Sequence, residues 1–271
     1  MTAHDPNIEF TGSIPALYDR FLGPVIFTPY ADDLTARVRA GLTAGRLLET
    51  ACGTGLVTRA LDRALPRDIR VVATDLNEAM LTHAQSRTGP SSRLEWRTAD
   101  AAALPFPDAS FDAVVTQFGL MFVPDKGLAF REARRVLRAG GSLVFNVWDQ
   151  MTENPFARVA HITISSFFAS DPPTFYQVPF GFSDRAALDG HLRAARFADV
   201  SLETVKKDLH APSAHDFARG LVEGNPVVAA IRDAGIPLDH VVDAVARALA
   251  AEGGAAPFTS TMQAVVGTAR A

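Results

Sequence analysis

The sequence predicts an α/β protein built on a doubly wound, mostly parallel β-sheet. Short apolar runs alternate with helical patterns between residues 46 and 147, in the order βαβαβαβαβ. The first run begins at residue 46 and passes into a glycine turn and then into a helical pattern. A strand, a glycine turn and a helix in this order place a ligand at the carboxyl end of the strand, where open α/β sheets bind ligands.

Composition limits the classes of partner. The chain has 271 residues, of which 48% are hydrophobic and 21% charged, which suits one large α/β domain or a core with an insertion. The formal net charge of −4 gives no attraction to nucleic acid or anionic membranes, so we expect neither as a partner. No apolar run approaches the ~18 residues of a membrane span, and the N-terminus lacks the pattern of a signal peptide.

The single cysteine, Cys52, excludes an intrachain disulfide and indicates the reducing cytoplasm. Cys52 is either a small side chain that fits the glycine turn or a nucleophile beside a helix N-terminus. The seven histidines are scattered singly, so we expect no metal site. The sequence leaves open whether the protein is a monomer or a homodimer.

The elements can be placed along the chain. After the first strand we expect strands at 69–74, 93–97, 111–116, 142–147, 200–209 and 260–267. We expect helices at 76–87, 126–138 and 183–195, and two or three more within 212–256. Residues 11–44 are expected to form helices broken by Pro15, Pro24 and Pro29, and Gly140–Gly141 to end the helix 126–138. Residues 1–10 are polar and expected to be loosely held.

The glycine turn argues against a dinucleotide. The fingerprint G-x-G-x-x-G would need glycine at position 58, where the chain has Thr58. Glu49, at the end of the preceding strand, would also repel a pyrophosphate. A cofactor that carries positive charge and no phosphate fits this turn better.

Asp75 follows the second strand at about the ~20 residues beyond the turn that a ribose-binding carboxylate requires. Its two oxygens can accept both hydroxyls of a ribose, and Leu76 and Met80 could flank an adenine. Asp75 could instead act as the N-cap of the helix 76–87, and the two roles are compatible.

Three phrases resemble the class I S-adenosylmethionine-dependent methyltransferases: residues 49–55 (Glu-Thr-Ala-Cys-Gly-Thr-Gly), residues 104–115, and residues 135–143, where Ala139 stands in place of the usual proline. The subgroup resembled includes the ubiquinone/menaquinone-biosynthesis C-methyltransferases and small-molecule O-, N- and C-methyltransferases. The resemblance is strong over residues 45–150. It implies a seven-stranded, Rossmann-like sheet in which the last strand runs antiparallel between the fifth and sixth.

With that resemblance the chain divides into an N-terminal helical segment (1–44), a cofactor-binding core (45–150), and a remainder (151–271) that completes the sheet and carries cap insertions at about 151–183 and 212–256. The implied cofactor is S-adenosylmethionine, with S-adenosylhomocysteine as product. Asp100 is implied to accept from the adenine amino group, and the segment with Tyr18 and Tyr30 to close over the methionine end, although core packing explains both tyrosines equally well. The implied cofactor residues are Tyr18, Tyr30, Glu49, Ala51, Cys52, Gly53, Thr54, Gly55, Asp75, Leu76, Met80, Asp100, Ala101, Ala102, Gln117 and Phe118.

The methyl acceptor is expected to be small and partly apolar. Its expected contacts are Phe27, Met121, Phe122, Trp148 and Phe182. These apolar side chains of the cap and loops could instead belong to the hydrophobic core. Position alone offers Tyr18, Trp148 and His161 as catalytic candidates, and a base is needed only if the acceptor is protonated at rest. Two alternatives remain: a catalytically silent module that binds S-adenosylmethionine or S-adenosylhomocysteine, and a nicotinamide-dependent oxidoreductase.

Overall fold

The computed structural model describes residues 9–271. Of the residues expected to be loosely held, 1–8 therefore lie outside the described part. The chain forms two compact units, described here one at a time. One unit consists of residues up to 29, 149–181 and 206–263, and the other of residues 30–148, 182–205 and 264–271.

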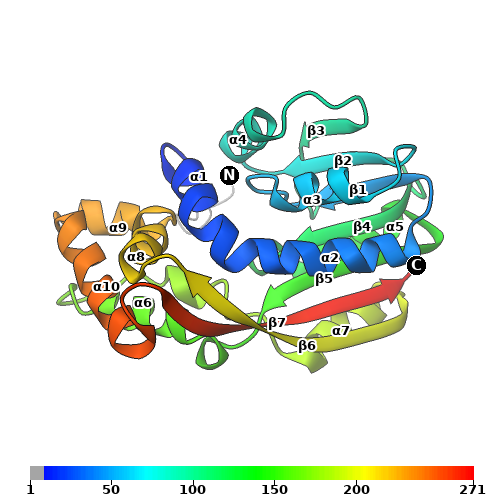
Figure 1. The fold of residues 1–271 in the computed structure, drawn as a ribbon. Coiled ribbons are helices and arrows are strands. Elements are labelled where there is room, and N and C mark those ends of the chain that lie inside the picture. The colour runs from blue at the N-terminus through cyan, green and yellow to red at the C-terminus, as the bar shows by residue number, and fades with distance from the viewer. Residues whose placement is uncertain (1–8) are drawn as a thin grey trace. The chain divides into compact units, whose positions relative to one another are not determined.

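The seven-stranded sheet has the order β3-β2-β1-β4-β5-β7-β6 (Figure 1). Strands β1 to β5 run parallel to one another, and β7 runs antiparallel to β5. The chain order reverses between β1 and β4, which is where open sheets of this type bind ligands. The expected sheet, with its last strand between the fifth and sixth, is confirmed. The strands are β1 (Arg46–Thr50), β2 (Arg70–Asp75), β3 (Leu94–Thr98), β4 (Phe111–Gln117), β5 (Leu137–Trp148), β6 (Ala198–Ala211) and β7 (Phe258–Arg270).

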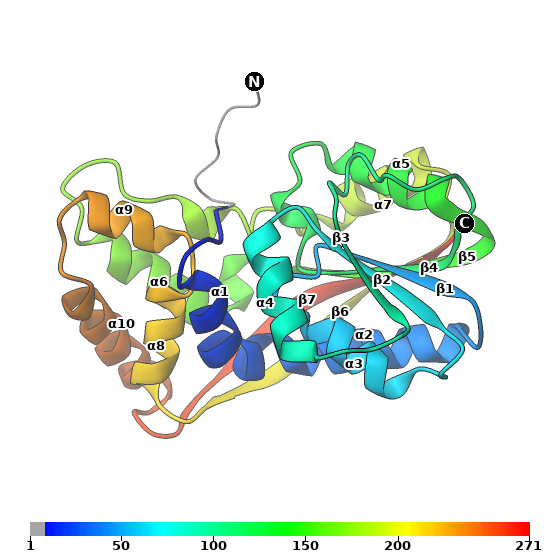
Figure 2. The same cartoon turned by 90° about the horizontal axis from the view of Figure 1, so that it is seen from above.

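Helices cover both faces of this sheet in the unit that contains residues 30–148. Helices α2 (Thr28–Gly41) and α3 (Leu56–Ala64) lie on one face, and α5 (Lys126–Val136) and α7 (Arg185–Ala194) on the other (Figure 2). Helix α4 (Glu78–Thr88) connects β2 to β3. The apolar positions of α2 and α3, such as Leu34 and Leu61, pack on strand residues such as Val115 in one continuous core. Burial of these side chains, at ~25 cal/mol per Å², holds the glycine turn in place between β1 and α3.

The end of helix α5 differs from the expectation. The helix stops at Val136, and Leu137 is already extended and pairs with Phe111, so the glycines at 140 and 141 lie inside the β5 run. A Cβ on Gly141 would lie 3.0 Å from the carbonyl oxygen of Asp112. Gly141 therefore serves a close strand contact, and the prediction that the two glycines end the helix is wrong.

The unit with residues up to 29 is mainly helical. Helix α8 contacts η2, α6 and α10, and its Phe217 packs on the rings of Phe156 and Phe258. These rings are buried and form the centre of this unit. Its elements are α1 (Ile14–Leu17), η2 (Tyr18–Phe27), η4 (Met151–Glu153), α6 (Pro155–Ser165), η5 (Phe175–Gln177), α8 (Ala214–Glu223), α9 (Val227–Asp233) and α10 (Leu238–Gly253).

Proline does not break the N-terminal helical segment as the sequence suggested. Residues 18–27 form a π-helix that contains Pro24 and runs directly into α2, which contains Pro29 in its first turn. The N–H and the hydroxyl of Thr28 both donate to the carbonyl of Gly23, five residues earlier. The wider π-turn accommodates a residue that has no N–H to donate, so the chain stays helical past Pro24.

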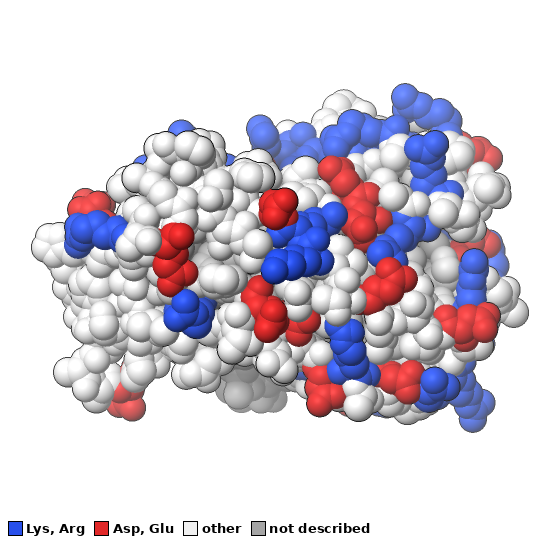
Figure 3. Space-filling view, turned by 60° about the horizontal axis from the view of Figure 1, so that its bottom comes forward, with Lys and Arg blue, Asp and Glu red and all other residues white. Residues whose placement is uncertain are grey.

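Charged side chains of both signs are interspersed over the face shown in Figure 3. Many form surface ion pairs, such as Arg138 with Asp112 and Arg158 with Glu252. Within residues 9–271, no helix has both the length and the apolar character needed to cross a bilayer.

Candidate functional site

The turn between β1 and α3 has an unusual backbone. Ala51, Gly53 and Gly55 all have positive φ, at 52°, 55° and 76°. A Cβ on Gly55 would lie 3.0 Å from the Cβ of Ala84, so glycine is required there for close helix packing. A Cβ on Gly53 would meet nothing within 4 Å. The turn therefore leaves open space beside bare backbone at Gly53.

Asp75 ties the end of β2 to this turn. Its Oδ2 accepts from the N–H of Gly53 and its Oδ1 from the N–H of Asn77, each at 2.8 Å. Each carboxylate oxygen keeps a further lone pair for a ligand hydroxyl. Burial raises the pKa of Asp75 above its usual value, against the effect of the backbone hydrogen bonds.

The alternative role of Asp75 as a helix N-cap is not observed. Helix α4 begins at Glu78, and its N-cap is Asn77, whose Oδ1 accepts from the N–H groups of Ala79 and Met80. The expected start of the helix at residue 76 is thus two residues too early. Leu76 is left with 58% of its surface exposed. An apolar side chain held out next to Asp75 is available to a flat ligand.

Glu49 lies inside the protein. Its side chain is 1% exposed, and its Oε2 accepts a 2.6 Å hydrogen bond from the hydroxyl of Thr58. Burial raises the pKa of Glu49 to about 8, although the hydrogen bond from Thr58 acts in the opposite direction. The sequence analysis considered Thr58 only because the dinucleotide fingerprint requires a glycine there. The signal that could have predicted its hydrogen bond to Glu49 is a hydroxyl in the first turn of a helix that follows an acid at the end of a strand.

The end of β4 holds an aromatic cluster. Phe118 has a φ of 49° and its ring stacks on Trp148 at 3.9 Å between centroids. Tyr30 meets both rings edge-on, at 5.3 and 5.5 Å, and its hydroxyl donates to the carbonyl of Val205. We call Tyr30, Phe118 and Trp148 the aromatic triad. Its members are 0%, 6% and 3% exposed, so they are rigidly packed.

Asn146 fixes the position of this triad. It lies on β5 opposite Gln117, and its Oδ1 accepts from the N–H of Phe118 at 2.9 Å. The side chain is 0% exposed, and its Nδ2 has no hydrogen-bond partner among the described residues. The sequence analysis did not single out Asn146, because an asparagine inside an apolar strand gives no sign of which backbone group it will bind.

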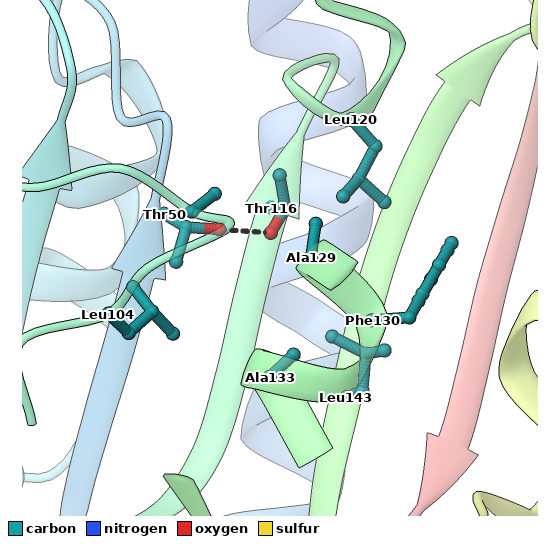
Figure 4. Close-up of a pocket in the computed structure, with 9 residues that line it drawn as sticks. Thr50, Leu104, Thr116, Leu120, Ala129, Phe130, Ala133 and Leu143 are labelled. Atoms are coloured by element: carbon teal, nitrogen blue, oxygen red, sulfur yellow. Dashed lines mark hydrogen bonds between the residues drawn. The ribbon is translucent and has the colours of Figure 1, made fainter. Parts of the chain in front are cut away.

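The turn after β3 presents Asp100. The carboxylate is exposed and accepts from the N–H of Ala102 at 2.8 Å, and the backbone closes from Asp100 to Ala103. Ala101 and Leu104 line a small apolar cavity with room for about one water molecule (Figure 4). At one side of this cavity Thr50 and Thr116 share a hydrogen bond between their hydroxyls.

The remaining predicted residues are distributed over both units. Met121 and Phe122 form a short helix after β4, η3 (Leu120–Phe122), with Met121 buried and Phe122 half-buried. The ring of Phe182 lies 5.2 Å from the ammonium of Lys126 and 5.9 Å from His191, at helices α5 and α7.

In the mainly helical unit, Tyr18 stacks on Phe27 at 4.6 Å. His161 lies 6.5 Å from the ring of Tyr176. These three candidates are therefore not in the same unit as the glycine turn.

The thiol of Cys52 is buried, and burial raises its pKa well above the usual value. A protonated thiol is a poor nucleophile, so the geometry favours its role as a small side chain in the turn. Among residues 9–271, no group of three His, Cys, Asp or Glu side chains is arranged to hold a metal ion.

These features fit an adenosyl cofactor. Gly53 leaves space for the ligand, Asp75 offers two acceptor oxygens, and Leu76 offers an apolar surface. The hydroxyl of Thr54, inside the turn, is buried and has no hydrogen-bond partner among the described residues. The arrangement is able to bind a ribose and a flat base next to the N-terminus of α3, where free N–H groups favour acceptors.

Comparison with known proteins assigns the domain. A family described as "Methyltransferase domain" matches residues 48–145. The ubiquinone/menaquinone biosynthesis C-methyltransferase UbiE of Hahella chejuensis is 39% identical over 127 residues, which are 45% of this chain and 51% of that protein. Residues 48–145 of the chain are thus similar to a methyltransferase domain.

The solved structures agree with this fold. The phosphoethanolamine N-methyltransferase 2 of Haemonchus contortus, in complex with S-adenosyl-L-methionine, has a TM-score of 0.63 at 15% identity and covers 99% of this chain and 60% of its own. The YcgJ protein of Bacillus subtilis has a TM-score of 0.59 at 15% identity and covers 89% of this chain and 98% of its own.

The resemblance to methyltransferases predicted from the sequence is thus confirmed for residues 48–145. The chain spans about half the length of the curated relative it matches. The family match ends at residue 145, within β5, and does not cover residues 146–271.

Proposed function

We propose that the protein is an S-adenosylmethionine-dependent methyltransferase that acts on a small, partly apolar acceptor. The observation that carries the proposal is the open space at Gly53 beside the carboxylate of Asp75. Both features lie at the carboxyl ends of adjacent parallel strands, in a domain of the methyltransferase family.

The residues of the site have distinct tasks in this proposal. When bound, S-adenosylmethionine supplies a methyl group made electrophilic by its sulfonium. Asp75 accepts from the ribose hydroxyls through the lone pairs that Gly53 and Asn77 leave free. Asp100 accepts from the adenine amino group through its exposed carboxylate. Glu49 becomes ionised next to the positively charged end of the cofactor, because an opposite charge favours the carboxylate.

The aromatic triad supports a flat or apolar acceptor. Phe118 follows Gln117 directly at the end of β4, and its ring is held by Trp148 and Tyr30. Packed rings exclude water and orient the acceptor through van der Waals contact. Orientation and exclusion of water are the main requirements of a methyl transfer. Met121, Phe122 and Phe182, which belong to the same unit as the triad, are proposed as acceptor contacts.

The acceptor class is proposed from the relatives. UbiE is named as a C-methyltransferase of ubiquinone and menaquinone biosynthesis, which makes carbon of an electron-rich ring the first chemistry to test. No residue is assigned as a base, since such a ring carbon attacks without one when its hydroxyl is ionised. We place the reaction in the cytoplasm, where the free thiol of Cys52 stays reduced.

The test uses S-adenosylmethionine with a labelled methyl group and a panel of hydroquinones, catechols and primary amines. The proposal expects label in a phenolic acceptor with wild-type protein and a large loss of it with Asp75→Ala. Binding of S-adenosylhomocysteine with no transfer to any acceptor would instead support the silent module. Binding of NADH in place of both adenosyl ligands would support the oxidoreductase.

A further inference from the structure

Helix α5 carries an ion pair that holds the segment following the Asp100 turn. Arg135 and Glu132 lie three residues apart, and Nε of Arg135 donates to Oε1 of Glu132 at 2.7 Å while Nη2 donates to Oε2 at 2.8 Å. The two parallel bonds fix the plane of the guanidinium. With that plane fixed, the N–H groups at the outer edge of the guanidinium point toward the backbone carbonyls of Leu104 and Phe106.

Those donors, together with one oxygen of Glu132, form hydrogen bonds to the backbone of residues 104–106, and we call this set of bonds the polar grip. Nη2 of Arg135 donates to the carbonyl of Leu104 at 2.9 Å, and Nη1 donates to the carbonyl of Phe106 at 2.8 Å. Oε2 of Glu132 accepts from the N–H of Leu104 at 2.8 Å. The pair therefore satisfies three backbone polar groups of Leu104 and Phe106, in a segment that belongs to no helix or strand.

The same segment is not fixed by packing alone. Leu104 faces Ala129 and Ala133 of α5 across the small apolar cavity, which Ala101 also lines (Figure 4). Side chains next to a void lose contacts on that side, so the hydrogen bonds from Glu132 and Arg135 add to the packing that holds Leu104. The polar grip on Leu104 lies directly next to the residue that closes the turn back to Asp100.

The surface contact of Arg135 contributes less than its buried contacts. Nη1 also donates to Oδ1 of Asp108 at 2.7 Å, but the Asp108 side chain is 77% exposed, and exposed ion pairs contribute little. Glu132 is only 16% exposed. Contact with Arg135 lowers the pKa of Glu132 and contact with Glu132 raises the pKa of Arg135, so both stay ionised and the grip is independent of pH over the neutral range.

We propose that Arg135 and Glu132 are positioning residues for the adenine end of the cofactor, acting through the backbone of residues 104–106 on the turn that carries Asp100. This inference rests on the proposed function. It gives a physical role to Arg135 in the phrase 135–143, which the sequence analysis used only as a family signature.

The test compares two ligands that differ at the base. S-adenosylhomocysteine has the adenine amino group, and S-inosylhomocysteine has a carbonyl oxygen in its place, which cannot donate a hydrogen bond to Asp100. Wild-type protein is expected to prefer the adenosyl ligand by roughly ten- to a hundredfold, the range for a hydrogen bond to a charged acceptor. Calorimetric titration measures both dissociation constants.

In Arg135→Gln the preference is expected to fall to within about threefold of unity, because Asp100 is no longer held where the amino group reaches it. Arg135→Lys keeps the charge and serves where Arg135→Gln does not fold. A single ammonium cannot reproduce the planar fork, so the same loss of preference is expected.

Arg138→Gln is the matched control. Arg138 also makes an ion pair with an aspartate, Asp112, at 2.6 Å, but Asp112 lies near the start of β4, away from the carboxyl edge of the sheet. Its loss is expected to lower the melting temperature and leave the ligand preference unchanged. An unchanged preference in Arg135→Gln and Arg135→Lys would overturn the inference, as would a wild-type protein that binds both ligands equally. If wild-type protein binds neither ligand, it is the proposed function that fails.

Discussion

Thr58 donates its hydroxyl to the buried carboxyl of Glu49 at 2.6 Å, and the two side chains are 0% and 1% exposed. The position that departs from the dinucleotide fingerprint is thus the one that satisfies the acid at the end of β1. A glycine at 58 would leave Glu49 without this donor. Thr58, which stands in place of the fingerprint glycine, and Glu49 therefore form one hydrogen-bonded unit.

The first expectation concerns this bond. Thr58→Val keeps the side-chain shape and removes the donor, so it should lower the free energy of unfolding by ~1–3 kcal/mol in urea denaturation. The matched control is Thr35→Val, since the Thr35 hydroxyl is buried and has no hydrogen-bond partner among the described residues. Thr35→Val should be neutral or stabilising. Equal losses in the two variants would show that the Thr58–Glu49 bond contributes nothing.

The raised pKa of Glu49 predicts a pH dependence of stability. The folded protein holds the proton up to about pH 8, whereas the unfolded chain releases it near 4.5. Between these values the folded state binds more protons, so the stabilising contribution is complete below about pH 4.5 and is lost as the pH rises through 8. Denaturation of wild type and Glu49→Gln at pH 6 and pH 9 measures it: the fall in stability should be smaller in Glu49→Gln, by on the order of 1–3 kcal/mol. Identical pH profiles would contradict this.

Gly53 and Gly89 provide a matched pair for the open space. Both have positive φ, at 55° and 73°, and a Cβ on either would meet no atom within 4 Å. Alanine at each should therefore introduce backbone strain, which at Gly89, with a ψ of −179°, is about 1–3 kcal/mol because that region is essentially restricted to glycine. Only Gly53→Ala should also weaken binding of S-adenosylhomocysteine, by roughly tenfold or more, since a methyl group would occupy ligand space. Equal affinities in the two variants would place the cofactor elsewhere.

Phe182 separates acceptor binding from packing. Phe182→Leu keeps most of the apolar volume against Lys126 and His191, and it removes the flat ring. We expect the KM for the acceptor to rise while the dissociation constant of S-adenosylhomocysteine stays within about threefold. A lower melting temperature with an unchanged KM would mean that Phe182 only packs helices α5 and α7.

The sequence was sufficient for the α/β core because its signals are local. Strands β1, β2, β4 and β5 each contain a short apolar run, and the glycine turn and Asp75 stand at fixed distances along the chain. Element ends were less accurate where tertiary pairing decides them. Leu137 is drawn into β5 by Phe111, and Asn77 replaces Asp75 as the cap because Asp75 is engaged by Gly53.

Features that depend on contacts between distant residues could not be read from the sequence. The π-turn over Pro24 depends on Thr28, whose N–H donates to the carbonyl of Gly23 five residues earlier. The bond from Phe118 to Asn146 joins two strands, and the grip of Arg135 on Leu104 spans 31 residues. A pattern in one segment carries no information on a partner in another, so such contacts became visible only in the fold.

The most direct test of the account is a calorimetric titration of S-adenosylhomocysteine into wild-type protein, Asp75→Asn and Asp75→Ala. The account predicts binding to wild type, with an affinity roughly ten- to a hundredfold lower in Asp75→Ala and an intermediate loss in Asp75→Asn, whose amide oxygen still accepts. Circular dichroism checks that the variants are folded. Absence of binding to wild type at millimolar ligand, or equal affinities for wild type and a folded Asp75→Ala, would contradict the assignment of the glycine turn and Asp75 as the cofactor site.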